Sequence, residues 1–342
     1  MARAFPGAPI YTTLYDRDAT FPEFAELDIR TSWLNRFAVF RRYHRLAFPF
    51  LAWAAASMYV DAETTLVSSS GWAHGFPVAG TKVVYCYSPA RWLYQPEKYL
   101  GGERVGLKSV ALSVLAPYLK RWDVKKAQSA DKYYAISTEV QERIRRVYGI
   151  DAEVLPAPHS FDAEASDEWV DLKSINADGR SFHLCISRLL PYKNVDAVIE
   201  AFNMLDLPLV VVGTGPEERR LAAMAGPTVL MLKDLTDGEI RWLYAHCAAV
   251  ISASYEDFGL TPLEAATYGK PSIVLRWGGF LDTVNERETG IYFDEPRPDS
   301  IRDAVVTSCD HPWDADVIRK SADRFTEEYF AARLMEGLSS NC

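Results

Sequence analysis

Short apolar runs alternate with helix-forming segments through the second half of the chain, and this alternation limits the possible folds most strongly. Strands are expected at residues 182–186, 208–212, 229–232, 250–252 and 272–275, with helices at 195–204 and 217–224. A further helix begins after Thr236, where Glu239 completes a capping box. Strands that alternate with helices form a parallel sheet covered on both faces. The pattern therefore predicts a doubly wound, Rossmann-like α/β domain.

The first half of the chain carries the same two kinds of segment with weaker periodicity. We predict helices near residues 37–48, 109–130 and 138–148, and strands at 10–15, 64–68, 82–86, 132–136 and 153–155. Ser137 is expected to cap the last helix. The polar stretch 161–179 is expected to be a linker. Because single cores rarely grow beyond about 250–300 residues, 342 residues should form two domains.

The composition excludes several classes of protein. An aromatic share of 13% argues against disorder, and a net charge of −9 without a recognition module argues against a nucleic-acid partner. Five cysteines without C-x-x-C spacing argue against a zinc site or a disulfide framework. The sequence does not begin with a secretion signal, and its longest apolar stretch, residues 48–58, is shorter than the ~20 residues of a membrane span. We expect a cytoplasmic protein, at most peripheral at the inner face of a membrane.

Two carboxylates separated by seven residues, Glu256 and Glu264, lie across a strand-to-helix turn, and Gly269 closes the helix that follows. The start of such a helix offers backbone N–H groups and a favourable dipole to phosphate oxygens. Arg188 and Lys193 follow another strand, where a turn can bring both cations onto the same phosphates. This arrangement suits a nucleotide sugar. The plainer alternatives are carboxylates that only interact with the helix dipole and a solvated pair of cations.

These segments resemble the motifs of family 4 retaining glycosyltransferases of GT-B fold. Residues 254–264 resemble the family's E-x7-E signature, 185–194 its GRL…KN segment and 209–216 its VGxGP turn, while 277–282 and 288–294 resemble its glycine-rich tail. The first half is similar to a mannosyltransferase-like branch. The resemblance implies two Rossmann-like domains that face each other across a substrate cleft.

The resemblance also implies the boundaries and the roles of individual residues. Residues 1–165 would bind the acceptor, 176–325 the nucleotide sugar, and 326–342 would form a helix that packs back toward the first domain. Arg188 and Lys193 would neutralise the departing diphosphate, Glu256 would contact the transferred sugar and Glu264 the ribose, without a metal or a cofactor. The other donor-binding positions are Gly213, Gly215, Asp234, Leu235, Phe258, Gly259, Leu260 and Thr261. Plainer alternatives are a turn role for Asp234 and a tight strand-to-helix turn at the two glycines of 213–215.

The acceptor side departs from the family pattern. Where similar enzymes commonly carry a His, this chain has Tyr87, which hydrogen-bonds but is a poor base near neutral pH. His74 in a nearby loop is a candidate substitute or else a structural residue, and Arg91 completes the expected acceptor side. Because the leaving phosphate can accept the proton of the acceptor, Tyr87 does not preclude transfer.

Two further features lie near the beginning of the chain. Residues 10–14 resemble the family's second strand, so its first strand and Gly-rich loop are not found, and two unpaired edges are expected inside the sheet. We expect a start codon placed too late or a truncated gene copy. Residues 33–58 combine aromatic residues with Arg36, Arg41, Arg42 and Arg45 and lack acidic residues. This segment fits either peripheral contact with an anionic membrane or packing on the core with the arginines outward.

The expected function is transfer of a hexosyl group, with retention, from a nucleoside-diphosphate sugar to a saccharide or lipid-linked acceptor in polysaccharide or glycoconjugate biosynthesis. Mannose from GDP-mannose is favoured, on the resemblance of the first half alone. One alternative is a catalytically impaired relative that acts as a nucleotide-binding partner protein. Another is a sugar-nucleotide or dinucleotide enzyme of ordinary Rossmann type.

Overall fold

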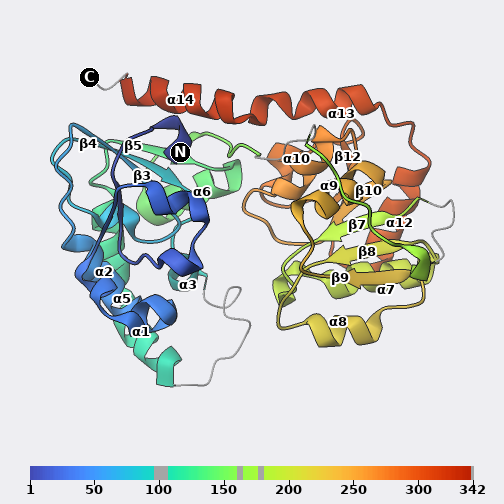
Figure 1. Ribbon diagram of the computed structural model, residues 1–342, viewed down its shortest axis with the longest axis horizontal. Coiled ribbons are helices and arrows are strands. Elements are labelled where there is room, and N and C mark those ends of the chain that lie inside the picture. The colour runs from blue at the N-terminus through green and yellow to red at the C-terminus, as the bar shows by residue number, and fades with distance from the viewer. Residues whose placement is uncertain (96–106, 160–164, 176–180, 340–342) are drawn as a thin grey trace. The chain divides into compact units, whose positions relative to one another are not determined.

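The computed structural model describes residues 1–95, 107–159, 165–175 and 181–339. Contacts divide the chain into two units, residues 1–155 with 331–342, and residues 156–330 (Figure 1). No described helix is long and apolar enough to cross a membrane.

Six parallel strands form the sheet of the second unit, in the order β12-β11-β10-β7-β8-β9. From β7 the chain winds through β8 to β9 on one side, and then from β10 through β11 to β12 on the other. This is the doubly wound order, and its switch point lies between β7 and β10, where ligands bind outside the carboxyl ends of the strands. The predicted Rossmann-like domain is confirmed. The strands are β7 (His183–Ile186), β8 (Leu209–Val212), β9 (Val229–Leu232), β10 (Ala249–Ser252), β11 (Ser272–Leu275) and β12 (Gly290–Phe293).

Helices cover both faces of this sheet (Figure 1). One core cluster joins a face of the sheet to α7 (Val195–Leu205), α8 (Glu218–Met224) and α12 (Pro298–Cys309). A second cluster joins the other face to α9 (Asp237–His246) and α10 (Leu260–Thr267). The strands β8 and β11 are buried throughout because each lies between the two helical layers. Two shorter helices are α11 (Phe280–Thr283) and α13 (Ala315–Ser321), and the capping box predicted at the start of α9 is confirmed.

The segment between the two halves is not a free linker. Val170 and Leu172 are buried and pack with residues of β7 and α9 in the second core cluster. The linker interpretation of residues 161–179 is therefore wrong for this part, because two apolar side chains two positions apart were enough to attach a polar stretch to the core. Residues 160–164 and 176–180 lie outside the described part of the chain.

The first unit contains two parallel sheets. In the larger sheet β3 (Thr64–Ser69), β4 (Thr81–Cys86), β5 (Lys132–Ala135) and β6 (Glu153–Val154) pair in chain order. The smaller sheet pairs β1 (Ile10–Thr12) with β2 (Ile29–Thr31), a strand that the sequence did not predict. Within the described residues no ladder joins the two sheets, so β1 and β3 each pair on one side.

The first unit has the helices predicted near residues 109–130 and 138–148, differs near residues 37–48, and has one short helix, residues 91–94, that the sequence did not predict. Ser137 caps α6 (Thr138–Tyr148) as predicted, since its hydroxyl accepts the Val140 N–H at 3.2 Å. The helix predicted near residues 37–48 is instead α1 (Ala38–Arg42), a 3-10 turn (His44–Ala47) and α2 (Phe48–Ala56). Pro49 lies in the first turn of α2, where proline favours the start of a helix over its continuation. The remaining helices are α3 (Arg91–Tyr94), α5 (Leu107–Ala127) and α14 (Glu327–Ser339).

Replacement of Val170 by Asp should destabilise the second unit by about 3–5 kcal/mol, because it places an uncompensated charge in an apolar cluster. Trp169→Asp is the matched control, since the neighbouring side chain is 64% exposed, and should change the free energy of unfolding by less than about 0.5 kcal/mol. Urea denaturation of both variants measures the difference. Equal stabilities would show that residues 165–175 do not belong to this core.

Candidate functional site

An ion pair crosses the switch point of the second sheet. Lys193 lies in the turn after β7 and Glu256 in the turn after β10, and these two strands are neighbours. The Lys193 ammonium contacts the Glu256 carboxylate, although the two residues are 63 positions apart in the chain. Lys193 is only 8% exposed. The interpretation of this lysine as part of a solvated pair is therefore wrong.

Hydrogen bonds hold the two turns together. The side-chain amide of Asn194, a residue in the left-handed conformation, donates to the Ala253 carbonyl at 2.8 Å. On the other side of the pair, the Ser254 hydroxyl donates to Glu256 at 3.1 Å. The cation and the carboxylate are thus fixed before any ligand arrives. Fixed charges are efficient partners for an anion because they need no reorganisation when it binds.

Arg188 is exposed, on the turn between β7 and Lys193. The structure places it at the correct end of the sheet, and its contact with a phosphate stays a prediction.

Gly213 and Gly215 form the tight strand-to-helix turn after β8. A Cβ at Gly213 would lie 1.8 Å from the Ser187 carbonyl oxygen, and one at Gly215 would lie 2.3 Å from that of Leu189. The Leu189 N–H also donates to the Thr214 carbonyl at 2.9 Å. The glycines therefore allow the turns after β7 and β8 to pack backbone against backbone. Their role in binding a ligand stays a prediction.

The start of α10 presents unsatisfied backbone donors. Gly259 precedes this helix with φ +86°, and no side chain caps it. Helix geometry leaves the first N–H groups, those at Leu260 and Thr261 among them, without intrahelical partners. Glu256 contacts Lys193, so the interpretation of this carboxylate as a partner of the helix dipole alone is wrong. The side chain of Phe258 is buried edge-to-face against Phe325, so only its backbone is available to a ligand.

Glu264 lies one turn into α10, on the side that faces α9. The hydroxyl of Tyr244 in α9 donates to one Glu264 oxygen, Oε2, at 2.6 Å. Burial raises the pKa of the Glu264 carboxyl, and the bond from Tyr244 partly offsets this rise. The carboxylate is thus held in one orientation, which excludes a simple role as an exposed partner of the helix dipole.

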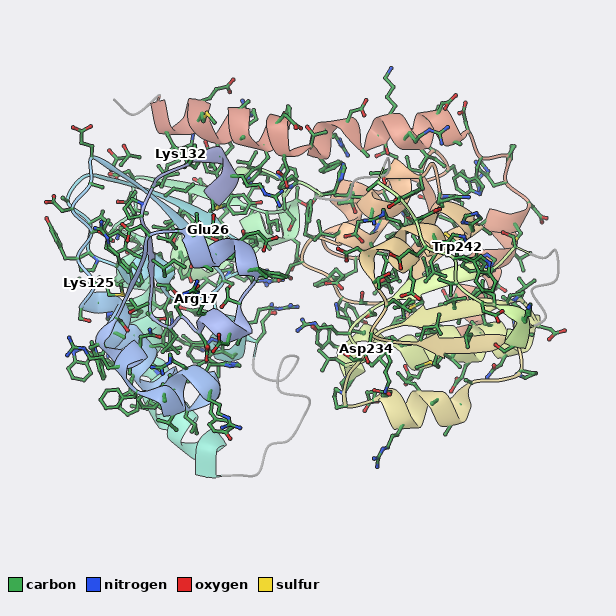
Figure 2. The ribbon with its side chains drawn as sticks, in the orientation of Figure 1. Arg17, Glu26, Lys125, Lys132, Asp234 and Trp242 are labelled. Carbon is green, nitrogen blue, oxygen red and sulfur yellow. The ribbon has the colours of Figure 1, made fainter. Side chains whose placement is uncertain are left out.

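Asp234 and Leu235 follow β9. Asp234, labelled in Figure 2, is exposed and in the left-handed conformation with φ 54°. Leu235 packs against the second core cluster. A left-handed Asp is typical of a turn. Their assignment to the donor site stays a prediction.

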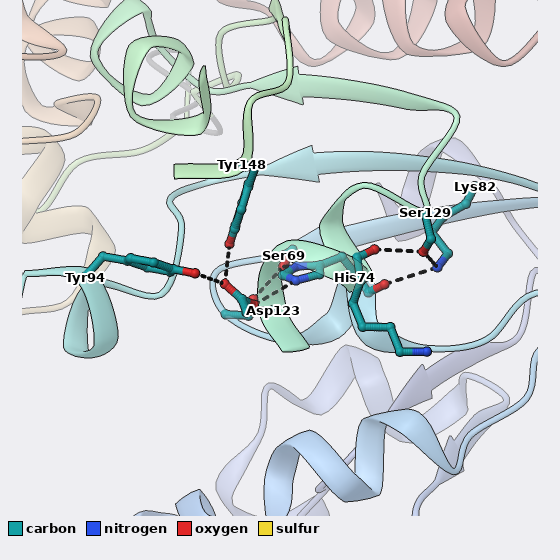
Figure 3. A network of polar contacts seen from close by, with 9 residues as sticks. Ser69, His74, Lys82, Tyr94, Asp123, Ser129 and Tyr148 are labelled. Carbon is teal, nitrogen blue, oxygen red and sulfur yellow. Dashed lines mark hydrogen bonds and ion pairs between the residues drawn. The ribbon is translucent and has the colours of Figure 1, made fainter. Parts of the chain in front are cut away.

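His74, which lies in the first unit, is buried and is not the acceptor contact that the sequence suggested. Its Nε2 lies 2.9 Å from Asp123 and its Nδ1 3.3 Å from the Ser69 hydroxyl, while Asp123 also accepts bonds from Tyr94 and Tyr148 at 2.8 and 2.9 Å (Figure 3). Burial raises the pKa of both tyrosines, which therefore remain donors. Ser69, His74 and Asp123 are each at most 1% exposed. The network resembles a hydrolase triad in its connections, but no substrate reaches it, so its role is structural.

Tyr87 and Arg91, the other residues expected on the acceptor side, are partly exposed near the carboxyl end of β4. The Tyr87 N–H donates to the Ser69 carbonyl at 2.9 Å, and its ring packs edge-on against Tyr85. Their roles toward an acceptor stay predictions. Among the described residues, no group of three or more His, Cys, Asp or Glu side chains is arranged to hold a metal ion.

Sequence reasoning missed Tyr244 and Asp123. Each is a polar residue on an otherwise buried helical face, and such a residue requires a partner. That signal indicates burial, but it does not identify the partner.

Comparison with known proteins agrees with this geometry. Residues 167–325 match the family model described as "Glycosyl transferases group 1". D-rhamnosyltransferase WbpZ from Pseudomonas aeruginosa is 26% identical over 238 residues, 65% of this chain and 60% of that protein. A GDP-mannose-dependent alpha-mannosyltransferase from Mycolicibacterium smegmatis is 28% identical over 210 residues, 58% of this chain and 54% of that protein. The chain thus matches less than two thirds of the length of either relative.

Solved structures show the same fold. A sucrose-phosphate synthase from Thermosynechococcus elongatus superposes on the whole of this chain and on 91% of its own, with a TM-score of 0.66 at 16% sequence identity. This likeness confirms the predicted GT-B fold class.

Replacement of Asp123 by Ala should destabilise the first unit by about 3 kcal/mol or more, because His74 and two tyrosine hydroxyls lose their buried acceptor. Asp28→Ala is the control. It removes an exposed pair with Arg30 and should cost about 1 kcal/mol or less. Denaturation followed by tryptophan fluorescence measures both. An Asp123 variant as stable as the control would contradict the structural role of this network.

Proposed function

We propose that this chain, whose residues 167–325 match the family model described as "Glycosyl transferases group 1", transfers a hexosyl group, with retention, from a nucleoside-diphosphate sugar to a saccharide or lipid-linked acceptor. One observation carries the proposal. A nearly buried lysine is paired with a carboxylate at the switch point of a doubly wound sheet. This is the place where such sheets bind nucleotides.

The chemistry requires stabilisation of a departing diphosphate. The bond between the anomeric carbon and the diphosphate oxygen breaks, and the oxygen keeps the electron pair. Lys193, Arg188 and the first N–H groups of α10 stabilise the negative charge that develops there. The acceptor hydroxyl attacks the same face of the sugar and gives its proton to the leaving phosphate. No protein base is needed, which agrees with the burial of His74.

The ion pair is suited to serve both parts of the donor. The Lys193 ammonium has three N–H donors and its contact with Glu256 uses only part of this capacity, so a phosphate oxygen can be added without breaking the pair. The Glu256 carboxylate likewise keeps lone pairs for a sugar hydroxyl. Glu264, in the helix that follows, is assigned to the ribose hydroxyls.

GDP-mannose is the proposed donor. The support is the similarity to the GDP-mannose-dependent alpha-mannosyltransferase described above, together with the resemblance of the first half. No described side chain in this structure distinguishes the base or the sugar by itself, so a donor panel decides this point.

We also propose that residues 33–58 contact an anionic membrane that carries the acceptor. Arg36 and Arg42 are exposed beside large apolar side chains, and the Arg42 guanidinium lies 5.7 Å from the centre of the Tyr43 ring. Apolar and basic groups that both face solvent favour a lipid surface over simple packing on the core. The exposed apolar residues are Phe37, Val39, Tyr43, Leu46, Phe48, Phe50 and Trp53.

Replacement of Lys193 by Ala, and separately of Arg188 by Ala, should reduce turnover by ~100-fold or more, because each removes a charge that stabilises the leaving group. Lys320→Ala, on the exposed end of α13, is the control and should keep normal turnover. The assay measures nucleoside diphosphate released from a panel that includes GDP-mannose and UDP-glucose. Near-normal turnover of both site variants would count against the proposed function.

The double variant Trp53→Ala, Arg42→Ala should bind phosphatidylglycerol vesicles at least about 10-fold more weakly than the unchanged chain, since it removes an apolar anchor and a cation. Trp169→Ala removes an equally exposed tryptophan from the second unit and should bind normally. Vesicle co-sedimentation measures both. Unchanged binding of the double variant would refute the membrane contact through residues 33–58.

A further inference from the structure

A buried tyrosine joins two residues of the proposed donor site. The Tyr244 hydroxyl donates to Glu264 at 2.6 Å, and the side chain of Thr261 also hydrogen-bonds it. Thr261 is the second residue of α10 and Glu264 lies about one turn later, whereas Tyr244 comes from α9. A single hydroxyl from a neighbouring helix thus contacts both.

The ring that carries this hydroxyl has a fixed position. Tyr244 is fully buried in the second core cluster with Cys247 and Ala265, and its ring stacks on that of Tyr268 at 6.0 Å between centres and 7° between planes. A fully buried side chain that also stacks on a neighbouring ring cannot turn its hydroxyl elsewhere. The direction of the bond to Glu264 is therefore set by the core.

The hydroxyl remains a donor over the working range of pH. Burial and the adjacent Glu264 carboxylate both raise the pKa of Tyr244 well above its ordinary value, so it stays protonated. Packing alone does not require this group, because phenylalanine fills the same space without the cost of desolvating a hydroxyl. The bond to Glu264 offsets that cost.

We propose that Tyr244 is a positioning residue that orients the Glu264 carboxylate toward the ribose hydroxyls of the donor, an inference that rests on the proposed function. With Oε2 held by Tyr244, the carboxylate cannot rotate, and its remaining lone pairs keep one direction. Two ribose hydroxyls then meet an acceptor group that is already oriented, which lowers the entropy cost of binding.

Calorimetry measures the affinity of GDP and of 2′,3′-dideoxy-GDP for the full unchanged chain and for the full chain with Tyr244→Phe. The unchanged chain should bind GDP more tightly than the dideoxy form. Tyr244→Phe should lose about 10-fold in GDP affinity, the effect of losing a hydrogen bond to a charged group, and little affinity for the dideoxy form. If Tyr244 had only a structural role, Tyr244→Phe would lower the affinity for both nucleotides alike. Tyr85→Phe, which removes a buried hydroxyl from the first unit, is the matched control and should bind both as the unchanged chain does.

The outcomes distinguish a failure of the positioning role of Tyr244 from a failure of the proposed function. If the unchanged chain prefers the ribose form and Tyr244→Phe keeps the same preference, the positioning role is overturned and the proposed function stands. If Tyr244→Phe lowers the affinity for both nucleotides equally, the residue is only structural and the inference is again overturned. If the unchanged chain binds neither GDP nor UDP, the proposed function itself fails.

The pH dependence gives a second readout. Burial raises the pKa of Glu264 and the Tyr244 bond lowers it. Because the ribose needs the carboxylate form, GDP affinity should fall as the pH drops through this pKa. Without the hydroxyl the pKa rises further, so Tyr244→Phe should lose affinity at a higher pH than the unchanged chain. The other titratable groups packed here, Tyr268 and Cys247 around Tyr244, are neutral in acid. If the GDP affinity of both proteins fell at the same acidic pH, the proposed contact would be contradicted.

Discussion

The pairing of Lys193 with Glu256 depends on the order of the parallel strands. Parallel strands end at one edge of a sheet, and the doubly wound order makes β7 and β10 neighbours although other strands separate them in the chain. The turns that follow these two strands therefore meet, and a cation and a carboxylate meet with them. The cost of holding a lysine at 8% exposure is offset by its partner and by the hydrogen bonds around it.

The remainder of the candidate site is built on this edge. Glycines let the turns after β7 and β8 approach backbone to backbone, and α10 begins just after the turn that carries Glu256, with no side chain capping its first N–H groups. Behind α10, Tyr244 fixes the second carboxylate from the hydrophobic core. Charge, backbone donors and an oriented acceptor thus come from four separate segments that only the fold brings together.

The sequence predicted the second unit well because its signals are local. Strands β9 and β11 lie at the expected residues because apolar runs define them directly. In the first unit, helix α6 does so as well, because its cap marks where it begins. The helix near residues 37–48 was wrong because the backbone leaves the helical conformation at Tyr43, with φ −125° and ψ 66°, and no glycine or proline marks this break in the sequence. His74 was misplaced for another reason: its partner Asp123 is 49 positions away, and burial by a distant helix leaves no local sign. Tyr244 was missed similarly, 20 positions before Glu264.

The central claim is that Lys193 and the start of α10 hold a diphosphate. A crystal structure of the chain with GDP bound tests this most directly. We expect phosphate oxygens within hydrogen-bond distance of the Lys193 ammonium and of the N–H groups that begin α10, with the ribose on Glu264. Phosphates bound elsewhere on the chain, with the Lys193–Glu256 pair untouched, would contradict it.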